Sequence, residues 1–243
     1  MLRRRREVDV DGLVAEHLAA GRPTGWFEPV YAAAFGQREA VPWAGDGPHP
    51  FVVDWLESPV ATPPGDRAVV VGCGLGDDAA ELARRGWQVT AFDIAPSALR
   101  WARRRHRRVD VDWRQQDLLD LPDRWGGAFD LVVEVHTVTS LPGVVRDGAM
   151  DAVGRLVAEG GVAVVVTLLA TGAQHAQGWV GPPWAQAPSE LATYRASGLV
   201  RLTLEHPPAG AEPAIEARVT WQRPMGVPAS ARAGPPDGGL PLA

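Results

Sequence analysis

A glycine-rich turn between an apolar run and a helical pattern is the feature that most constrains this chain. Residues 72–76 read Gly-Cys-Gly-Leu-Gly and follow the apolar run 68–71. A short apolar run of this kind is typical of a strand buried on both faces. Residues 78–85 then have helical periodicity and stop at Gly86. Because glycine tolerates positive φ and close approach of the backbone to a ligand, this strand–turn–helix unit predicts a binding site at the turn.

Patterns of strand and helix alternate through the middle of the chain. We expect further strands over 88–92, 109–113, 129–136 and 162–169, with helices over 96–105 and 148–158. Alternation of this kind gives a parallel sheet with helices on both faces. After a long loop over 170–184 and a helix near 188–197, the runs 199–206 and 214–222 are expected to form an antiparallel strand pair that closes the sheet. The predicted fold class is therefore α/β, a doubly wound and mostly parallel sheet.

The two ends of the chain differ in character from this middle part. A helix is expected over 8–20, followed by a loop rich in aromatic residues, and helical spacing resumes over 51–57. We therefore expect residues 1–57 to form a helical and aromatic cap over the site and residues 58–224 to form the core. The Pro- and Gly-rich residues 225–243 are expected to be a disordered tail.

Composition limits the classes of partner. The chain has 243 residues, a formal net charge of −5 and a single cysteine. The negative charge argues against a nucleic-acid partner, and the one cysteine suits a reducing cytoplasm. The longest apolar stretch, 162–170, is too short to span a bilayer, so no membrane partner is expected. The absence of lysine among the 24 cationic residues suggests a GC-rich bacterial genome. A monomer or a homodimer is expected.

Three aspartates, Asp93, Asp77 and Asp78, narrow the choice of cofactor. Asp93 ends the second predicted strand about 20 residues after Gly72, where a carboxylate can hold the ribose hydroxyls of a nucleoside. Dinucleotide-binding turns need a third glycine where Asp77 stands, and they place a pyrophosphate at the amino end of the helix. Asp77 and Asp78 would repel that pyrophosphate. The charge pattern therefore favours the sulfonium cofactor S-adenosylmethionine over NAD or FAD.

Asp117 follows the third predicted strand. There it can accept a hydrogen bond from the exocyclic amine of adenine, while the backbone of Leu118 contacts the edge of the ring. A simple turn aspartate is the alternative. Cys73 lies inside the glycine turn and is interpreted as a small packed residue, because no base is placed to activate it.

Together, these segments resemble the class I S-adenosylmethionine-dependent methyltransferases over roughly residues 67–169. The matching motifs are residues 72–76, 92–94, 116–118, 129–134 and 156–161. The resemblance implies a Rossmann-like sheet of seven strands with an inverted last hairpin. The predicted cofactor-binding residues are Trp43, Gly72, Cys73, Gly74, Gly76, Asp93, Ile94, Asp117, Leu118 and Glu134.

Residues 41–50 are similar to a segment of the thiopurine, thiol and halide methyltransferases. The shared features are Pro42-Trp43 and the run Gly47-Pro48-His49-Pro50, which is similar to the Gly-x-Pro-x-Pro pattern of that branch. This resemblance implies that Trp43 lies against the cofactor. Val41 and Ala44 depart from the pattern of that branch.

Glu134 and His136 stand at the carboxyl end of the fourth predicted strand. Because strand side chains alternate, residues two apart point to the same side, here toward the expected methyl group. We interpret His136 as the proton acceptor or the group that orients the methyl acceptor, with a buried structural histidine as the alternative. Glu134 is expected to contact the cofactor or to orient His136. No metal site is expected.

Five aromatic or imidazole side chains are expected to wall an apolar acceptor, with a role in the packed caps as the alternative. They are Trp26, Tyr31, His175, Trp179 and Trp184. No Asn/Asp-Pro-Pro-Tyr/Phe segment follows the fourth strand, which together with the acidic charge favours a small molecule over a nucleobase. The predicted function is methyl transfer to O, S or N of a small molecule. The alternatives are a non-catalytic methyltransferase-like subunit and a nicotinamide-dependent oxidoreductase.

Overall fold

The computed structural model describes residues 8–34, 36–171, 181–207 and 214–226, and in these residues a seven-stranded sheet forms the centre of the molecule. Its strands are β1 (Arg67–Val71), β2 (Gln88–Asp93), β3 (Val111–Gln115), β4 (Phe129–Val135), β5 (Val157–Ala170), β6 (Val200–Glu205) and β7 (Ala214–Gln222). They lie in the order β3-β2-β1-β4-β5-β7-β6. Strands β1 to β5 pair in parallel, while β7 is antiparallel to both β5 and β6. The predicted fold class, with its closing antiparallel pair, is confirmed.

The central strands are apolar at nearly every position because both faces of the sheet are covered. Alternate residues of β1 belong to two different clusters, with Val69 on one face and Val70 on the other. Helices α6 (Gly143–Leu156) and α8 (Ala192–Ala196) cover the first face, whereas α3 (Pro50–Glu57) and α4 (Asp77–Arg84) cover the second. This two-sided burial explains why the sequence shows continuous apolar runs instead of alternation.

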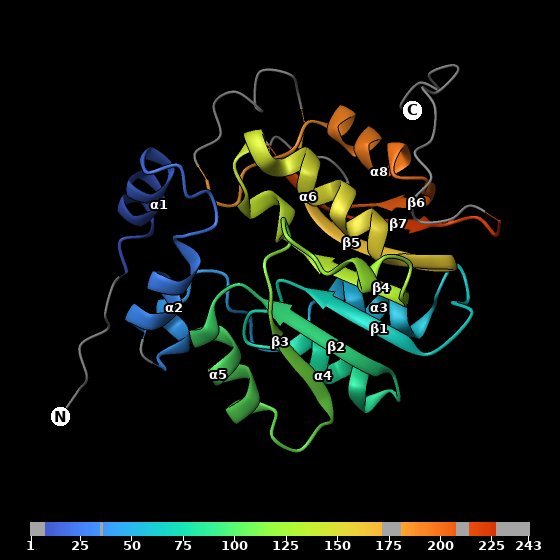
Figure 1. Ribbon diagram of the computed structural model, residues 1–243, viewed down its shortest axis with the longest axis horizontal. Coiled ribbons are helices and arrows are strands. Elements are labelled where there is room, and N and C mark those ends of the chain that lie inside the picture. The colour runs from blue at the N-terminus through green and yellow to red at the C-terminus, as the bar shows by residue number, and fades with distance from the viewer. Residues whose placement is uncertain (1–7, 35, 172–180, 208–213, 227–243) are drawn as a thin grey trace.

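The remaining helices gather at one end of the sheet. In Figure 1, α2 (Phe27–Ala34) lies between α1 (Val10–Ala19) and α5 (Pro96–Arg105), and it contacts both helices. Short 3-10 helices connect the other elements: η1 (Arg38–Ala40), η2 (Asp123–Trp125), η3 (Val138–Ser140) and η4 (Pro188–Leu191). None of the helices in the described parts of the chain combines the length and the apolar character that a bilayer span requires.

Four elements differ from the expectations above. The aromatic segment after residue 20 was expected as a loop, but Phe27–Ala34 is helix α2, whose Val30, Tyr31 and Ala34 are buried at helical spacing. Pro29 is compatible with this helix because it stands in the first turn, where its missing N–H is not needed. Helix α6 begins at Gly143, five residues earlier than expected, because burial of its apolar face outweighs the weak helix propensity of glycine.

Strand β5 also begins earlier than expected. The fifth strand was expected over 162–169, but Gly160 and Gly161 also lie within β5, where the pairing with β4 shifts register between Phe129 and Leu131. The glycines therefore mark a bulge rather than a strand end. Strand β3 runs over Val111–Gln115, two residues later than expected. The expected tail beyond residue 226 and most of the loop after Ala170 lie outside the described residues.

Helix α3 packs against the second face of the sheet, whereas the segment that precedes it lines the site. Val52 and Trp55 are 1% exposed and belong to the same cluster as Val70 and Leu131. The segment between α2 and α3 is therefore anchored on its carboxyl side in the main core.

We expect Trp55→Ala to lower the free energy of unfolding by about 3–5 kcal/mol, because it leaves a cavity in the main core. Urea unfolding followed by circular dichroism measures this change. Val144→Ala is the control, since Val144 is 88% exposed on α6, and it should change stability by less than about 0.5 kcal/mol. Equal stabilities of the two variants would mean that α3 is not part of the core.

Candidate functional site

A cavity of about 420 Å³ opens at the carboxyl edge of the parallel strands. Its walls come from the segments that follow β1, β2, β3 and β4, together with the segment that leads into α3. These segments are residues 70–78, 92–94, 116–119, 135–137 and 43–50. The volume is that of a site for a small organic ligand.

The glycine turn after β1 forms the floor of this cavity and packs closely against its neighbours. Gly72 has φ +56°, and a side chain there would overlap the side chain of Thr137, which follows β4. Gly76 has φ +83°, and a side chain there would overlap the ring of Trp113 in β3. Both positions need glycine for its φ and for the space.

Asp93 lies at the end of β2 beside this turn and is 6% exposed. One carboxylate oxygen accepts a hydrogen bond from the Gly74 amide at 2.8 Å, and the other accepts one from the Ala95 amide at 2.8 Å. Burial raises the pKa of Asp93 to about 6, and these two backbone hydrogen bonds oppose the rise. Each oxygen keeps lone pairs for a further donor.

The other predicted cofactor-binding residues of the strand ends also lie at the cavity. Ile94 and Leu118 line it, and so does Asp117, whose Oδ1 accepts a hydrogen bond from the Leu119 amide at 2.9 Å. Cys73 lines it as well, and burial raises the pKa of its thiol, which suits the packed role expected for it.

The two aspartates at the start of α4 have protein partners. Asp77 forms ion pairs with Arg105 at 3.0 Å and with His106 at 3.4 Å. Asp78 accepts a hydrogen bond from the backbone amide of His49 at 2.7 Å. This last contact ties the segment before α3 to the glycine turn.

Acidic side chains dominate the charge of the cavity. Five aspartates line it, and no arginine does, among the residues that the structure describes. They are Asp46, Asp77, Asp78, Asp93 and Asp117. Such a lining favours a cationic ligand and disfavours a pyrophosphate.

An aromatic group from the N-terminal segment lies over the cavity. Trp43 is 39% exposed, and its indole N–H donates to the hydroxyl of Tyr31 at 2.8 Å. Both residues line the cavity, as does Phe27. Trp26 was expected to face the acceptor, but it is fully buried, stacks on Phe27 and is not part of the lining.

The other residues expected to wall the acceptor come from the loop after β5. Trp184 donates its backbone amide to the carbonyl of Thr139 at 2.6 Å, and it is not part of the cavity lining. His175 and Trp179 lie outside the described residues.

The side chains of Glu134 and His136 do not point to the same side, although strand alternation led us to expect it. Strand β4 ends at Val135, and His136 has φ +54°, so the chain turns sharply between the two side chains. Glu134 is 1% exposed, and its Oε1 accepts hydrogen bonds from the amides of Thr137 at 2.6 Å and Val138 at 3.0 Å. It therefore holds the turn that carries His136 and does not line the cavity itself.

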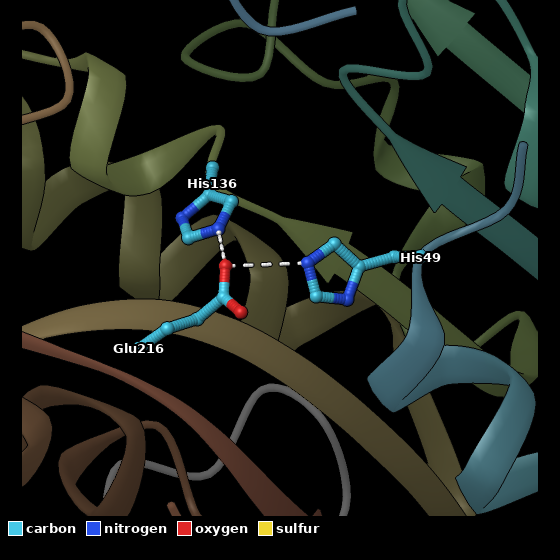
Figure 2. Close-up of side chains that lie close together, drawn as sticks. All are labelled: His49, His136 and Glu216. Atoms are coloured by element: carbon cyan, nitrogen blue, oxygen red, sulfur yellow. Dashed lines mark hydrogen bonds and ion pairs between the residues drawn. The ribbon is translucent and has the colours of Figure 1, made fainter. Parts of the chain in front are cut away.

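His136 lines the cavity as part of a group of three side chains (Figure 2). Its Nε2 lies 2.7 Å from Oε1 of Glu216 in β7, and Nε2 of His49 lies 3.2 Å from the same oxygen. These hydrogen bonds, from His136 first and from His49 second, hold the pKa of Glu216 well below its usual range. The carboxylate is therefore ionised at neutral pH. We call His49, His136 and Glu216 the histidine–glutamate cluster.

Two members of this cluster, His49 and Glu216, were not predicted as site residues from the sequence. His49 appeared only as part of the Pro-rich segment before α3, and Glu216 was not singled out. His136 and Glu216 are 80 residues apart in the chain, and His49 and Glu216 are 167 apart. No local spacing could have indicated that they meet, although an antiparallel last strand beside β5 brings Glu216 to this edge.

Comparison with protein families and sequences gives matches over the central part of the chain. Residues 68–161 match the family model described as a methyltransferase domain. A ubiquinone biosynthesis O-methyltransferase from Xanthomonas campestris is 34% identical over 148 residues, which is 57% of this chain and 61% of that protein. The chain thus spans about three fifths of the length of the curated relatives that it matches.

Solved structures share the fold over most of the chain. An N-methyltransferase, NodS, from Bradyrhizobium japonicum in complex with S-adenosylhomocysteine covers 86% of this chain and 98% of its own, with a TM-score of 0.59 and 19% identity. Magnesium protoporphyrin IX methyltransferase from Synechocystis with bound S-adenosylmethionine covers 89% and 98%, with a TM-score of 0.59 and 16% identity. At these identities the likeness concerns the fold.

We expect Gly72→Ala to lower the free energy of unfolding by about 1–3 kcal/mol, because it forces a side chain into positive φ and against Thr137. Gly148→Ala is a matched control in α6, where an added Cβ meets nothing within 4 Å. It should raise the stability by about 0.5–1 kcal/mol through better helix propensity. Urea unfolding of both variants measures the difference, and a neutral Gly72→Ala would mean that the turn has room for a side chain.

Proposed function

We propose that this chain, whose residues 68–161 match a methyltransferase domain, is a class I enzyme that transfers the methyl group of S-adenosylmethionine to O, S or N of a small-molecule acceptor. The observation that carries the proposal is the acidic cavity at the carboxyl edge of the sheet, with a glycine turn as its floor. A site of this charge suits the sulfonium and ammonium groups of that cofactor.

The residues at the cavity fit this cofactor. Asp93 keeps lone pairs on both oxygens, so it can accept hydrogen bonds from both ribose hydroxyls. Asp117 and Leu118 line the cavity, and we assign them to contacts with adenine. The backbone of residues 72–76 also lines it and is assigned to the methionine part. When bound, the cofactor supplies an electrophilic methyl carbon on its sulfonium.

The protein's own contribution is to place the acceptor and to exclude water. Orientation of two reacting groups can contribute about 7–11 kcal/mol to a displacement reaction. His136 is proposed as the proton acceptor or the group that orients the acceptor, because it lines the cavity and is fixed by Glu216. Glu134 supports His136 indirectly by holding the turn that follows β4.

A small acceptor is supported by the dimensions of the cavity and by its aromatic rim. Tyr31 and Trp43 line the cavity, and we assign their rings to contacts with an apolar or aromatic acceptor and, for Trp43, also with the cofactor. The name of the Xanthomonas relative refers to O-methylation of a small molecule. Kinship with the thiopurine, thiol and halide branch is part of the proposal and rests on residues 41–50.

Incubation with methyl-labelled S-adenosylmethionine and a panel of phenols, thiols, thiopurines and amines tests this function. We expect label to be transferred to at least one class of small molecule, with release of S-adenosylhomocysteine. Boiled protein and reactions without acceptor are the controls. Label found only in RNA or protein would contradict the small-molecule assignment, and cofactor binding without any product would favour a non-catalytic subunit.

Cofactor binding should weaken in acid because of Asp93. Below its pKa of about 6 this carboxyl is protonated and loses acceptor capacity toward the ribose. We therefore expect the affinity for S-adenosylhomocysteine, measured by calorimetry, to fall by about tenfold between pH 8 and pH 5.

The control for this pH dependence is Asp93→Asn, which cannot ionise. The variant should bind about ten- to a hundredfold more weakly at pH 8, because a hydrogen bond to a charged group is lost, and its affinity should vary less with pH. The same pH dependence in variant and wild type would remove Asp93 from the cofactor site.

A further inference from the structure

We propose that His49, His136 and Glu216 bind one first-row divalent transition-metal ion at the wall of the cavity. The three side chains come from the start of α3, the turn after β4 and the middle of β7, so three separate parts of the chain converge on one point (Figure 2). Two of the three line the cavity.

The spacing of the ligand atoms suits a cation. One nitrogen from each histidine and one oxygen from Glu216 all lie within 4.8 Å of one another. The measured pairs, 2.7 Å and 3.2 Å, are close to the separation of about 3 Å between neighbouring ligand atoms that each lie roughly 2.0–2.2 Å from one metal ion. Small shifts of the side chains would complete the site.

The kind of ligand selects the kind of metal. Two imidazole nitrogens and one carboxylate oxygen suit Zn²⁺, Fe²⁺, Co²⁺ or Ni²⁺, whereas Mg²⁺ and Ca²⁺ prefer oxygen ligands. Three protein ligands leave at least one coordination position open, as in catalytic metal sites. The open position is available to a ligand in the cavity.

The charge of the cluster also favours a cation. Within the described residues, both ion pairs of Glu216 are with histidines, which are neutral unless protonated. Arg218, two residues along β7, is paired with Glu205 and donates to the carbonyl of Phe51 at 2.7 Å. The Glu216 carboxylate therefore has no permanent cation as a partner in this part of the structure.

The backbone of both histidines is fixed before any ion arrives. The His136 amide donates to the carbonyl of Val166 at 2.9 Å, and the His49 amide donates to Asp78 at 2.7 Å. On binding, metal coordination would replace the two hydrogen bonds to Glu216, and one further contact would change. Nδ1 of His49 accepts a bond from the Phe51 amide at 3.3 Å, and it must carry the ring proton when Nε2 binds the metal. This bond is long, and its loss costs little.

The metal would define the class of acceptor, a step that rests on the function proposed above. An ion at this wall would coordinate an acceptor through an anionic oxygen, such as a phenolate or an enolate with a second oxygen beside it. It would hold that oxygen in the cavity and lower its pKa, as bound cations do. His136 would then orient the acceptor through the metal and would not accept its proton.

Calorimetry on the metal-stripped full chain tests the site without any cofactor or acceptor. Titration with ZnCl₂ should give one site per chain, while MgCl₂ at the same concentration should give no binding. Replacing Zn²⁺ with Co²⁺ should produce visible absorption bands of a nitrogen- and oxygen-ligated ion. Glu216→Gln, His49→Ala and His136→Ala should each weaken Zn²⁺ binding by at least tenfold.

His206→Ala is the matched control for adventitious binding, because His206 is exposed and is not one of the three proposed ligands. It should bind Zn²⁺ like the wild type. Thermal unfolding checks that each variant is folded, and Glu216→Gln keeps the shape of a half-exposed side chain, so it should fold normally. Wild-type affinity in Glu216→Gln, or no Zn²⁺ binding by the wild type, would overturn the proposal.

An activity measurement separates this inference from the proposed function. If both hold, a chelator should suppress methyl transfer, and added Zn²⁺, Mn²⁺ or Co²⁺ should restore it. Metal binding without methyl transfer would leave the site intact and reject the function. Methyl transfer by metal-free protein at the full rate would reject a role for the metal in that reaction.

Discussion

The close packing of the turn after β1 is the constraint on which the rest of the structure depends. Residues 72–76 pass between the segment after β4 and the ring of Trp113 in β3 with no room for a side chain at Gly72 or Gly76. This close approach brings the ends of β1, β2 and β4 to one edge, where Asp93 can bond to the backbone of the turn. A ligand held there contacts backbone and carboxylates from several strands at once.

The fold could be predicted from the sequence because its signals are local. A strand buried on both faces requires a continuous apolar run, and β1, β4 and β5 each contain one. The three elements whose extents were predicted wrongly, α2, α6 and β5, contain proline or glycine, which have low propensity for helices and strands. In each case burial of one face stabilises the element against its local propensity.

The two halves of the candidate site differ in how far they could be predicted. The expected cofactor side comprises residues just after β1, β2 and β3, so motif spacing was enough to place Asp93 and Asp117 at the cavity. The acceptor side depends on tertiary packing. Glu216 reaches His136 only because β7 lies between β5 and β6 in the sheet. In addition, the positive φ of His136 turns its side chain to a different side from that of Glu134. Neither feature has a signature in a single sequence.

The bond between the His49 amide and Asp78 joins these two halves mechanically. Asp78 stands in the first turn of α4, directly after the glycine turn, while His49 belongs to the opposite wall. A displacement of the amino end of α4 would therefore pull on the backbone that carries the His49 imidazole. By thermodynamic reciprocity, a ligand that displaces His49 would act on α4 to the same extent, so this one hydrogen bond is a direct route for coupling between the two halves of the cavity.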